Sequence, residues 1–583
     1  MIIVGLNAYH GDVAVAVLRD GALVAALEEE RFCRIKHVAG FPSRAIARGL
    51  AMAGTRADEV DVWAVARGRR VHLARKAWFA LTHRPGRALL DQYRNTAGKN
   101  TAIADVIADT FGLDRAAVNT RTRYIEHHPA HLASAYRTSG LAEAACCAID
   151  GFGDFVSVST AHGRGGRLDV LDRVYFPHSL GLVYLAITQY LGFKKYGDEY
   201  KVMGLAPYGT PRQAEAIHQL LRLEPGGGFR LNLEYFRHWT GEATMTWNDG
   251  EPNVPDVFTD RLIDLLGPSR RPDEPVTSIH EDLAASVQRV FEDAAFHVLR
   301  GAHQKVSVDH LCLAGGCAMN SVANGKIRQN TPFRHVFIQP AAGDNGTALG
   351  AALEAWHQSG VRAVGPRMEH SSWGTSYTDA EIATVIAESG VVAQGRGQLT
   401  TIATEAALCD ATAARLVAGD VVGWYQGRME WGARALGNHS ILADPRRRDM
   451  RDIINQKIKF RERFRPFAPS ILAEAIDEYF VDAVHDPFMI QVYPVRPEKR
   501  DVIPAVTHVD GSGRLQSVSQ ASNPRYWALI RAFHAQTGVP VLLNTSFNEN
   551  EPIVERPEQA LDCFLRTDMD VLVMGSHMLR KPS

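Results

Sequence analysis

The sequence has no long apolar run, no secretory start and almost no net charge. None of its hydrophobic segments approaches the roughly 18 residues that a membrane-spanning helix needs. Met1–Leu6 enters an apolar strand without the basic start of a signal peptide. With 64 basic and 65 acidic side chains, no global field recruits nucleic acid or an anionic membrane. We therefore expect a cytoplasmic protein with neither nucleic acid nor membrane as a partner.

Paired cysteine motifs are also missing. The seven cysteines include no Cys-x-x-Cys pair, which argues against a disulfide framework or a zinc ribbon. Cys146 and Cys147 lie in an apolar stretch and are expected in the core rather than as nucleophiles. The chain of 583 residues exceeds what one core supports, and a prior of about 150 residues per domain predicts roughly four structural units.

A histidine-rich segment, EHHPAHLASAY at 126–136, carries the first chemical signal. Pro129 suits the first turn of a helix, so we expect a loop with His127 and His128 and then a helix. In or near helical geometry His127 and His131 lie one turn apart on the same face, within reach of one metal ion. A divalent metal site is one interpretation of this pair.

Two distant carboxylates strengthen that interpretation. The apolar run 144–149 ends in Asp150 and a glycine, as when a buried strand delivers a side chain to a loop. A second loop, AAGDNG at 341–346, embeds Asp344 in small residues before an Ala/Gly-rich helix. A His-x-x-x-His pair also occurs by chance on surface helices, and the zincin pattern fails because a histidine follows the first histidine where a glutamate is required.

A strand, a polar glycine-containing loop and a hairpin occur twice in the first third of the chain. The first copy runs from 2–6 through NAYHGD to a hairpin that turns at Asp20. The second spans 146–170, with the loop DGFGD and a turn at 163–166. This layout resembles the phosphate loops of the actin and sugar-kinase superfamily, in which two related lobes clasp a nucleotide. Two lobes are therefore predicted.

A further glycine loop, GGCAMN at 315–320, follows the short apolar strand 311–313. Glycines between a strand and a helix let backbone N–H groups approach a phosphate or adenosine closely. The Asp344 loop follows a similar strand, so both loops should open at the carboxyl ends of neighbouring strands, where ligands bind in such sheets. The charged loop KKYGDEYK adds cleft candidates, although a solvated surface loop would look similar: Asp198, Glu199 and Lys201.

Weak periodicity over 361–400 places a domain boundary there, giving domains 1–365 and 366–583. Before this boundary, the charged segment EEERFCRIKH at 28–37 has a composition that is as typical of a solvated loop as of a functional segment. The basic stretch 67–87, with Trp78 and Phe79 interleaved, is predicted as a helical insertion with a solvated face rather than a nucleic-acid site.

The last third concentrates basic side chains among aromatic residues and prolines: Arg428, Arg434, Lys457, Lys459, Arg461, Arg463 and Arg465. A solvated helix would alternate such charges with acids, but Arg434 lies between two alanines and Arg465 between Phe464 and Pro466. Guanidinium groups in apolar settings need anions, and phosphates suit their geometry. Two later motifs, HVDGSGRLQSV and VPVLLNTSFN, add Arg514, Asn544 and Ser546. This domain is predicted to bind polyphosphate.

Together the motifs resemble the carbamoyltransferase family of nodulation protein U and the cephalosporin carbamoyltransferases. The matching stretches are GLNAYHGD, EEERFCRIKH, EHHPAHLASAY, AIDGFGD, KVMGLAPYG, GGCAMN, WGARALGNHS, FRPFAPS and LLNTSFN. They span nearly the whole chain in family order. The resemblance implies an α/β protein with a two-lobed actin-like N-terminal domain, similar to the tRNA threonylcarbamoyl transferases, and a YrdC-like C-terminal domain.

The resemblance further implies a two-step reaction. The YrdC-like domain would make carbamoyl adenylate from carbamoyl phosphate and ATP with Mg²⁺, and the N-terminal domain would pass the carbamoyl group to a hydroxyl or amine of a natural-product acceptor. Its pattern places the metal on His127, His131, Asp150 and Asp344. Iron(II) is expected there, with manganese(II) as the alternative, because imidazole and carboxylate ligands do not themselves select zinc.

Other roles follow from the same resemblance. His10 would be the general base beside the acceptor, with Asp12 next to it, and Lys36 would lie at the adenylate. The adenylate would also contact Gly315, Gly316 and Asn320. Carbamoyl phosphate and ATP would contact Arg434, Arg465, Arg514, Asn544 and Ser546. His128 is expected in the core and not as a ligand.

Two other functions fit parts of the sequence. A small-molecule kinase of the same superfamily would use the two-lobed cleft, but it needs neither the clustered histidines nor a second phosphate-binding domain. A tRNA-modifying protein of the threonylcarbamoyl type would share both domains, and the near-zero net charge disfavours it. The acceptor and the oligomeric state stay open, with a homodimer as one expectation.

Overall fold

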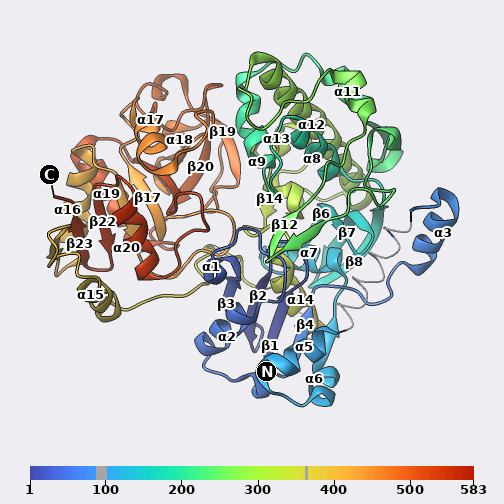
Figure 1. Ribbon diagram of the computed structural model, residues 1–583, viewed down its shortest axis with the longest axis horizontal. Coiled ribbons are helices and arrows are strands. Elements are labelled where there is room, and N and C mark those ends of the chain that lie inside the picture. The colour runs from blue at the N-terminus through green and yellow to red at the C-terminus, as the bar shows by residue number, and fades with distance from the viewer. Residues whose placement is uncertain (87–88, 90–101, 362–364, 583) are drawn as a thin grey trace. The chain divides into compact units, whose positions relative to one another are not determined.

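The computed structural model describes residues 1–86, 89, 102–361 and 365–582 (Figure 1). The described chain divides into two compact units, Met1–Met368 and Glu369–Ser583. Part of the predicted boundary region, 362–364, and Arg87 of the basic stretch lie outside the described residues. Among the described helices none is long and apolar enough to cross a membrane.

The first sheet of unit 1 has the order β3-β2-β1-β4-β5. Its first three strands form an antiparallel meander, and β4 and β5 continue it in parallel to β1. The predicted hairpin is confirmed as β2 and β3. The strands are β1 (Ile2–Asn7), β2 (Ala14–Arg19), β3 (Ala22–Glu28), β4 (Val62–Val65) and β5 (Thr122–Tyr124).

The second sheet repeats this plan. Its order is β14-β13-β6-β7-β8, in which β6, β7 and β8 form the meander and β13 and β14 run parallel to β6. In each sheet the strand that comes first in the chain, β1 or β6, is central. The hairpin flanks it on one side and the two parallel strands flank it on the other. The repeat confirms two related lobes. The strands are β6 (Glu143–Gly153), β7 (Val156–Arg164), β8 (Arg167–Tyr175), β13 (His310–Ala314) and β14 (His335–Ile338).

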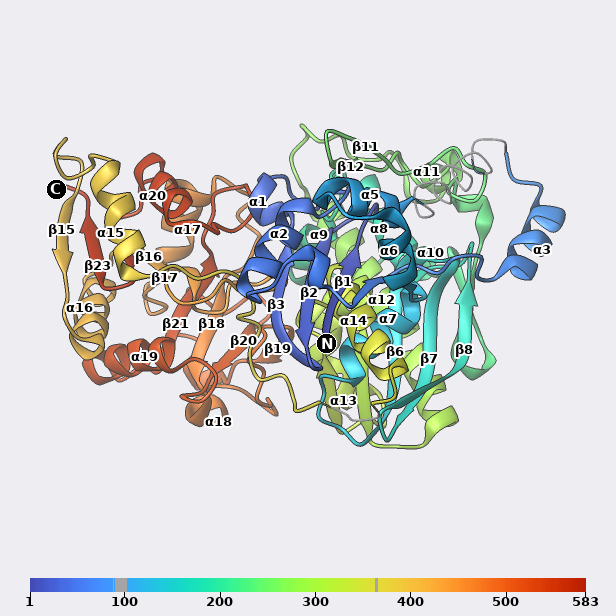
Figure 2. The ribbon, with the colours of Figure 1, turned by 90° about the horizontal axis from the view of Figure 1, so that it is seen from below.

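Helices α7 (His127–Tyr136) and α14 (Asn345–Gln358) pack against each other between the two sheets (Figure 2). Small residues permit this approach. A Cβ on Gly350 of α14 would lie 1.7 Å from the carbonyl oxygen of Ala130 in α7, and a Cβ on Gly5 of β1 would lie 2.0 Å from a carbonyl of α14. The Ala/Gly-rich sequence of α14 therefore serves close packing on both sides.

The structure corrects where α7 begins. The predicted loop carrying His127 and His128 is the first turn of the helix, which starts at His127 after the extended residue Glu126. Pro129 falls at the third helical position, where its missing N–H has no intrahelical partner to lose. The two histidines of the metal prediction are therefore truly one helical turn apart.

Other helices cover the outer faces of unit 1. The 29-residue α12 packs with α8 against β6, and α2, α5 and α6 pack on the first sheet. The remaining elements of the unit are α1 (Glu30–Cys33), α2 (Ser43–Met52), α3 (Leu73–His83), α5 (Ile103–Phe111), α6 (Arg115–Arg121), α8 (Leu180–Tyr190), α9 (Glu199–Leu205), α10 (Ala214–His218), β9 (Leu221–Glu224), β10 (Gly228–Leu231), β11 (Thr246–Asn248), β12 (Glu251–Asn253), α11 (Asp260–Leu266), α12 (Ser278–Val306) and α13 (Ser321–Asn330).

Unit 2 is built on a nine-stranded mixed sheet of order β15-β23-β22-β16-β17-β21-β18-β20-β19. Helices α16 and α19 pack together, and one continuous hydrophobic cluster spans the unit. The strands are β15 (Gln398–Thr401), β16 (Val422–Tyr425), β17 (His439–Ala443), β18 (Ala468–Leu472), β19 (Gln491–Pro494), β20 (Ser512–Val518), β21 (Val541–Ser546), β22 (Val571–Met574) and β23 (His577–Arg580). The helices are α15 (Asp379–Glu388), α16 (Glu405–Val417), α17 (Met450–Ile454), α18 (Ile476–Tyr479), α19 (Pro524–Thr537) and α20 (Pro557–Arg566).

Candidate active site

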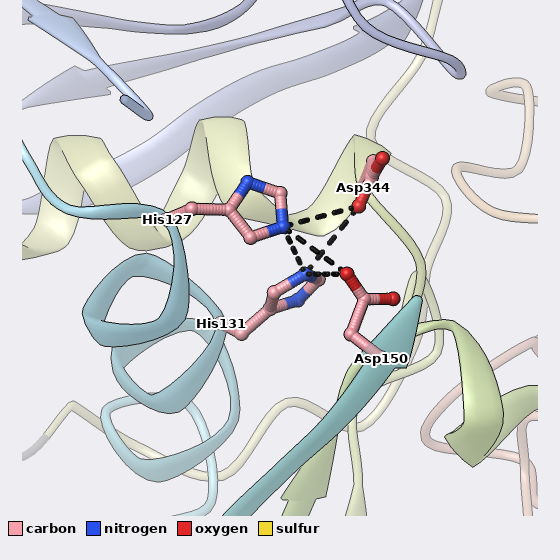
Figure 3. A group of neighbouring side chains, drawn as sticks. All are labelled: His127, His131, Asp150 and Asp344. Atoms are coloured by element: carbon pink, nitrogen blue, oxygen red, sulfur yellow. Dashed lines mark hydrogen bonds and ion pairs between the residues drawn. The ribbon is translucent and has the colours of Figure 1, made fainter. Parts of the chain in front are cut away.

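Helix α7 points two buried imidazoles at the same spot. The Nε2 atoms of His127 and His131 lie 3.0 Å apart, and both side chains are fully buried (Figure 3). Gly153 makes room for them, since a Cβ there would lie 1.9 Å from a ring carbon of His127. Two N–H groups cannot face each other at that separation, so at least one imidazole presents a lone pair to the space between them.

Two carboxylates complete the group, as the sequence predicted. Asp150 lies near the end of β6 and Asp344 between β14 and α14. Asp150 Oδ2 and Asp344 Oδ1 each lie 3.3 Å from Nε2 of His127. Their distances to Nε2 of His131 are 3.7 and 3.5 Å. Because β6, β13 and β14 are parallel neighbours, their carboxyl-end loops meet at one edge of the sheet.

These four side chains form a cage that fits a divalent metal. Their inward-facing atoms all lie within 4.8 Å of one another. Tetrahedral ligands about 2.1 Å from a cation lie about 3.4 Å apart, which matches the four N–O separations of 3.3 to 3.7 Å. Two buried carboxylates beside neutral imidazoles leave a negative charge that one divalent cation neutralises.

The electrostatics of the cage show the same need for positive charge. Burial lowers the pKa of His127, but hydrogen bonds with Asp150 and Asp344 outweigh burial and raise that pKa to about 10. Burial raises the pKa of Asp344, yet His10 and the two caged imidazoles hold it well below its ordinary value. Without a cation, the protonated imidazole of His127 supplies positive charge to the cage. Metal binding would displace its proton.

Asp150 also connects the cage to the glycine loop. Its Oδ1 accepts a hydrogen bond from the backbone N–H of Gly316 at 2.7 Å. Gly315 has φ +92°, and a Cβ there would collide with the backbone of β6, so only glycine suits the turn. Asn320 caps α13 and donates to Gln288 at 2.9 Å, so its amide supports the shape of the loop. A role of these residues toward the adenylate stays a prediction.

His10 lies at the rim of the cage. Its Nδ1 pairs with Oδ2 of Asp344, and its ring centroid is 5.7 Å from that of His127. The His10 side chain is 19% exposed, whereas His127 is fully buried. Asp344 thus joins the predicted general base to the predicted metal ligands. With Nδ1 paired in this way, Nε2 is the nitrogen that can exchange a proton.

A second group of side chains that could bind a metal ion already has balanced charges. Asp12, Glu30 and His37 lie close enough to share a cation. However, Nδ1 of His37 is 2.7 Å from Asp12, and Glu30 is 2.8 Å from Arg31. The exposed Lys36 adds positive charge beside both Glu30 and His37. This group therefore has no deficit for a metal to fill, and it places Lys36 near the Asp12 loop.

In unit 2 four arginines come together, with Glu462 paired to Arg465 at 3.7 Å and Asp486 acting on Arg514. Burial first, and then the positive charges of the other three, hold the pKa of Arg514 well below its ordinary value, while Asp486 offsets this in part. Burial lowers the pKa of Arg434 to about 10. Among the described residues, the Nε atoms of Arg434 and Arg514 are buried without a hydrogen-bond partner. The cluster consists of Arg434, Arg461, Arg465 and Arg514.

Asn544 lies beside this cluster on the central sheet. Its Nδ2 donates to the carbonyl of Ala435, next to Arg434, at 3.2 Å and to Gln516 at 3.0 Å. Gln516 lies two residues after Arg514 on β20, so both side chains leave the same face of the sheet. The amide oxygen of Asn544 is buried and has no partner within the described part of the chain. The site therefore offers several N–H donors and one unused acceptor.

Two known protein families match the two parts of this chain. Residues 2–353 match the model of the carbamoyltransferase N-terminus, and 413–581 match that of the carbamoyltransferase C-terminus. The chain belongs to the carbamoyltransferase family. This carbamoyltransferase is 39% identical to nodulation protein NolNO of Sinorhizobium fredii, over 99% of this chain and 80% of that protein. An uncharacterised protein of Synechocystis is 40% identical over 99% and 96% of the two lengths.

Solved structures resemble the carbamoyltransferase only distantly. Component A of (R)-2-hydroxyglutaryl-CoA dehydratase from Acidaminococcus fermentans covers 62% of this chain and 100% of its own, with 14% identity and a TM-score of 0.34. HypF of T. kodakarensis covers 62% of this chain and 48% of its own, with 15% identity and a TM-score of 0.31. Similarity at this level supports no argument about activity.

Not all of the predicted basic cluster of the carbamoyltransferase takes part in the arginine site. Lys459 is 1% exposed and donates to the carbonyl oxygens of Ser546 and Asn548 at 2.6 and 2.7 Å. Arg428 donates to two backbone carbonyls of the segment 373–374, and Arg463 is exposed. Backbone oxygens satisfy the ammonium group of Lys459, which sets this side chain apart from the four clustered arginines.

Several buried acids of the carbamoyltransferase were missed by the sequence reasoning. Asp154 accepts from the backbone N–H of His127 at 2.9 Å and so fixes the start of α7. Glu28 pairs with Arg31 at 2.6 Å and accepts from Asn345, which ties the first sheet to the Asp344 loop. The sequence signals that could have revealed Glu28 and Asp154 were the acidic run EEER and the loop DGFGD. Glu430 holds the Arg434 loop by accepting three backbone N–H groups, those of Leu436, Asn438 and His439.

Proposed function

We propose that the protein is an ATP-dependent carbamoyltransferase that works in two steps. The second unit, which we take to be YrdC-like, forms carbamoyl adenylate from carbamoyl phosphate and Mg²⁺-bound ATP. The first unit then transfers the carbamoyl group to a hydroxyl or amine of a natural-product acceptor. Membership in the family supports carbamoyl transfer as such, and the two sites support the order of events.

The main support for the first step is that hydrogen-bond donors and an acceptor occur together in one site of unit 2. Arg434 and Arg514 hold buried Nε–H groups that meet no acceptor in the described part of the chain, and phosphate oxygens are strong acceptors for them. Asn544 holds a buried amide oxygen that no described residue contacts as a donor, and the carbamoyl NH₂ group is a donor. Carbamoyl phosphate carries both complementary groups in one small molecule. Arg465, which is near Arg514, and Ser546, two residues after Asn544 on β21, are further predicted contacts.

In unit 1 the cage of His127, His131, Asp150 and Asp344 would hold the metal. Imidazole and carboxylate ligands suit iron(II), which we propose, or manganese(II). A cation there would polarise the carbamoyl carbonyl as a Lewis acid. The glycine loop at 315–316 would receive the adenylate, and the hydrogen bond from the N–H of Gly316 to Asp150 would hold the loop in place beside the cage.

His10 would take the proton of the acceptor. Its Nδ1 is engaged by Asp344, which orients the ring and stabilises the imidazolium that forms. Asp12 would lie on the acceptor side, and Lys36 would meet the phosphate of the adenylate. The proton, the base and the reacting carbonyl would then all be organised around Asp344.

The test is the fate of ATP when the purified protein is incubated with Mg²⁺ and carbamoyl phosphate and no acceptor. We expect pyrophosphate together with carbamoyl adenylate or AMP, detected by mass spectrometry, only when carbamoyl phosphate is present. ADP without pyrophosphate would point to the kinase alternative and remove the basis for the adenylate step. Salt-dependent binding of tRNA would favour the tRNA-modifying alternative instead.

A further inference from the structure

Tyr196 lies against the loop that carries His10 and Asp12. A Cβ built on Gly11 would lie 2.5 Å from the phenol oxygen of Tyr196 and 2.9 Å from its Cζ. The ring also meets His37 edge to face, with centroids 5.6 Å apart. Tyr196 belongs to the loop between α8 and α9, the KKYGDEYK segment that the sequence suggested for the cleft, and none of the metal ligands comes from this segment.

The phenol is surrounded by acids. Burial first, and then these negative charges, raise the pKa of Tyr196 well above its ordinary value, so the hydroxyl keeps its proton. The carboxylates that act on it are Asp344, Asp12, Glu199 and Asp150. Two of them are predicted metal ligands, and the phenol oxygen itself lies against Gly11, beside His10.

The hydroxyl of Tyr196 has no hydrogen-bond partner among the described residues. Other buried tyrosines of the same unit are satisfied: Tyr136 donates to the carbonyl of Ala142 and Tyr184 donates to Gln288, both at 2.9 Å. A partly buried phenol usually finds a partner. An O–H donor without one, beside a predicted catalytic histidine, is suited to bind a substrate oxygen.

We propose that Tyr196 donates a hydrogen bond to the carbonyl oxygen of the carbamoyl group during transfer, an inference that rests on the proposed function. In that step the nucleophile forms a bond to the carbamoyl carbon and gives its proton to His10. The bond between that carbon and the phosphate oxygen breaks, and AMP leaves with the electron pair. Negative charge builds on the carbonyl oxygen in between.

The chemistry of the surroundings favours this oxygen as the partner. A cation in the cage would neutralise Asp150 and Asp344, but the carboxyl groups of Asp12 and Glu199 lie outside that cage. A developing oxyanion beside them needs donors that are not themselves anions. The hydroxyl of Tyr196, which lies against the His10–Asp12 loop, is a neutral donor of this kind. Loss of one such donor lowers the rate of acyl transfer by about 100-fold.

The experiment follows the decay of carbamoyl adenylate on the full-length enzyme loaded with its metal. The adenylate is first formed from ATP, Mg²⁺ and carbamoyl phosphate, and then chased with hydroxylamine as the probe nucleophile or with buffer alone. Rapid acid quench and mass spectrometry measure adenylate, AMP and hydroxyurea. For Tyr196→Phe we expect the same yield of adenylate and a decay about 100-fold slower with both nucleophiles, at an unchanged half-saturating hydroxylamine concentration.

Two further variants control the result. Tyr235→Phe removes an exposed hydroxyl that donates to Gln219 at 3.4 Å, and in this variant the adenylate should decay at the wild-type rate. Gly11→Ala forces the phenol away without removing it, and it should slow decay as Tyr196→Phe does. A wild-type decay rate in Tyr196→Phe would overturn the proposal. So would a change confined to the half-saturating concentration, because the hydroxyl would then hold the nucleophile.

Failure of the proposed function gives a different result. In that case the wild-type enzyme itself forms no carbamoyl adenylate, and the inference about Tyr196 falls with it. If the wild-type enzyme forms and consumes the adenylate while Tyr196→Phe behaves identically, only the role of Tyr196 is disproved.

Discussion

Asp150 accepts a hydrogen bond from the backbone N–H of Gly316 at 2.7 Å. The bond uses Oδ1, which leaves Oδ2 to face the imidazoles of α7. One carboxylate thereby joins the end of β6 to the loop after β13. The predicted metal cage and the predicted adenylate loop consequently cannot move independently of each other.

Gly316→Ala should disturb both functions of Asp150. The added Cβ would lie 2.9 Å from Asp150 Oδ1, which forces the carboxylate or the loop to shift. We expect the decay of carbamoyl adenylate to slow by about 10-fold or more, while adenylate formation in unit 2 is retained. Gly228→Ala is the matched control, since its nearest neighbours are 3.6 Å away. Wild-type decay in Gly316→Ala would show that the contact is dispensable.

His131→Ala should abolish metal binding. It removes one of four inward-facing ligand atoms and leaves two buried carboxylates with a single imidazole. Metal content measured by elemental analysis should fall from about one ion per chain to near zero. His162→Ala, which removes an imidazole of a partly exposed pair with Glu143, should keep its metal. Full metal content in His131→Ala would refute the assignment of the cage.

His10→Ala should separate the two half-reactions. The variant lacks the group that we assign as general base, but it leaves unit 2 untouched. Pyrophosphate release in a single turnover should match the wild type, whereas transfer to an acceptor should fall by about 100-fold or more. Transfer at the wild-type rate would contradict the acid–base role.

Arg434→Ala should lose the ability to form the adenylate and should unfold at a higher temperature. Adenylate formation should be lost, while transfer from supplied carbamoyl adenylate should persist. Because the four clustered guanidinium groups repel one another, removing one should raise the thermal unfolding midpoint, by about 2 °C. Inorganic phosphate should stabilise the wild type more than the variant. Arg463→Ala, at an exposed neighbour, is the control and should change neither property.

The pair of His37 and Asp12 predicts a pH-dependent contribution to stability. Burial lowers the pKa of His37, but the charge and hydrogen bond of Asp12 outweigh burial and raise it to about 9. An unfolded histidine titrates near 6.5. The raised folded-state pKa means that the contribution is fully present below about pH 6.5 and is lost as the pH rises through 9.

Asp12→Asn tests this contribution. Asp12 has φ +55°, a conformation that asparagine also tolerates. The thermal midpoint of the variant should lie further below that of the wild type at pH 6 than at pH 9.5. An equal difference at the two pH values would mean that the ion pair contributes nothing.

The sequence predicted the chemistry of the cage better than its surroundings. His127 and His131 could be paired from their spacing, and Asp150 and Asp344 from their places after apolar strands. Local periodicity encodes such positions, because strands and helices fix which residues share a face or an end. It misplaced the start of α7 because the capping residue, Asp154, lies 27 positions further along the chain.

The same limit applies to the basic residues of unit 2. Composition grouped Lys459 with the arginines, but a density of charge says nothing about which oxygens each side chain will meet. In the fold, Lys459 contacts Ser546 and Asn548, which lie 87 and 89 positions away. The arginines instead meet one another, since strand β20 brings Arg514 beside the loop of Arg434.

By itself, the sequence determined the duplicated strand and hairpin plan, the family and the side chains able to hold a metal or an anion. Only the tertiary structure decided which of them meet. Asp150 faces Gly316, Tyr196 reaches Gly11, and Asn544 lies beside Arg434, each across a large separation in sequence. Such contacts depend on how parallel strands and packed helices bring chain segments together, and no local pattern records that geometry.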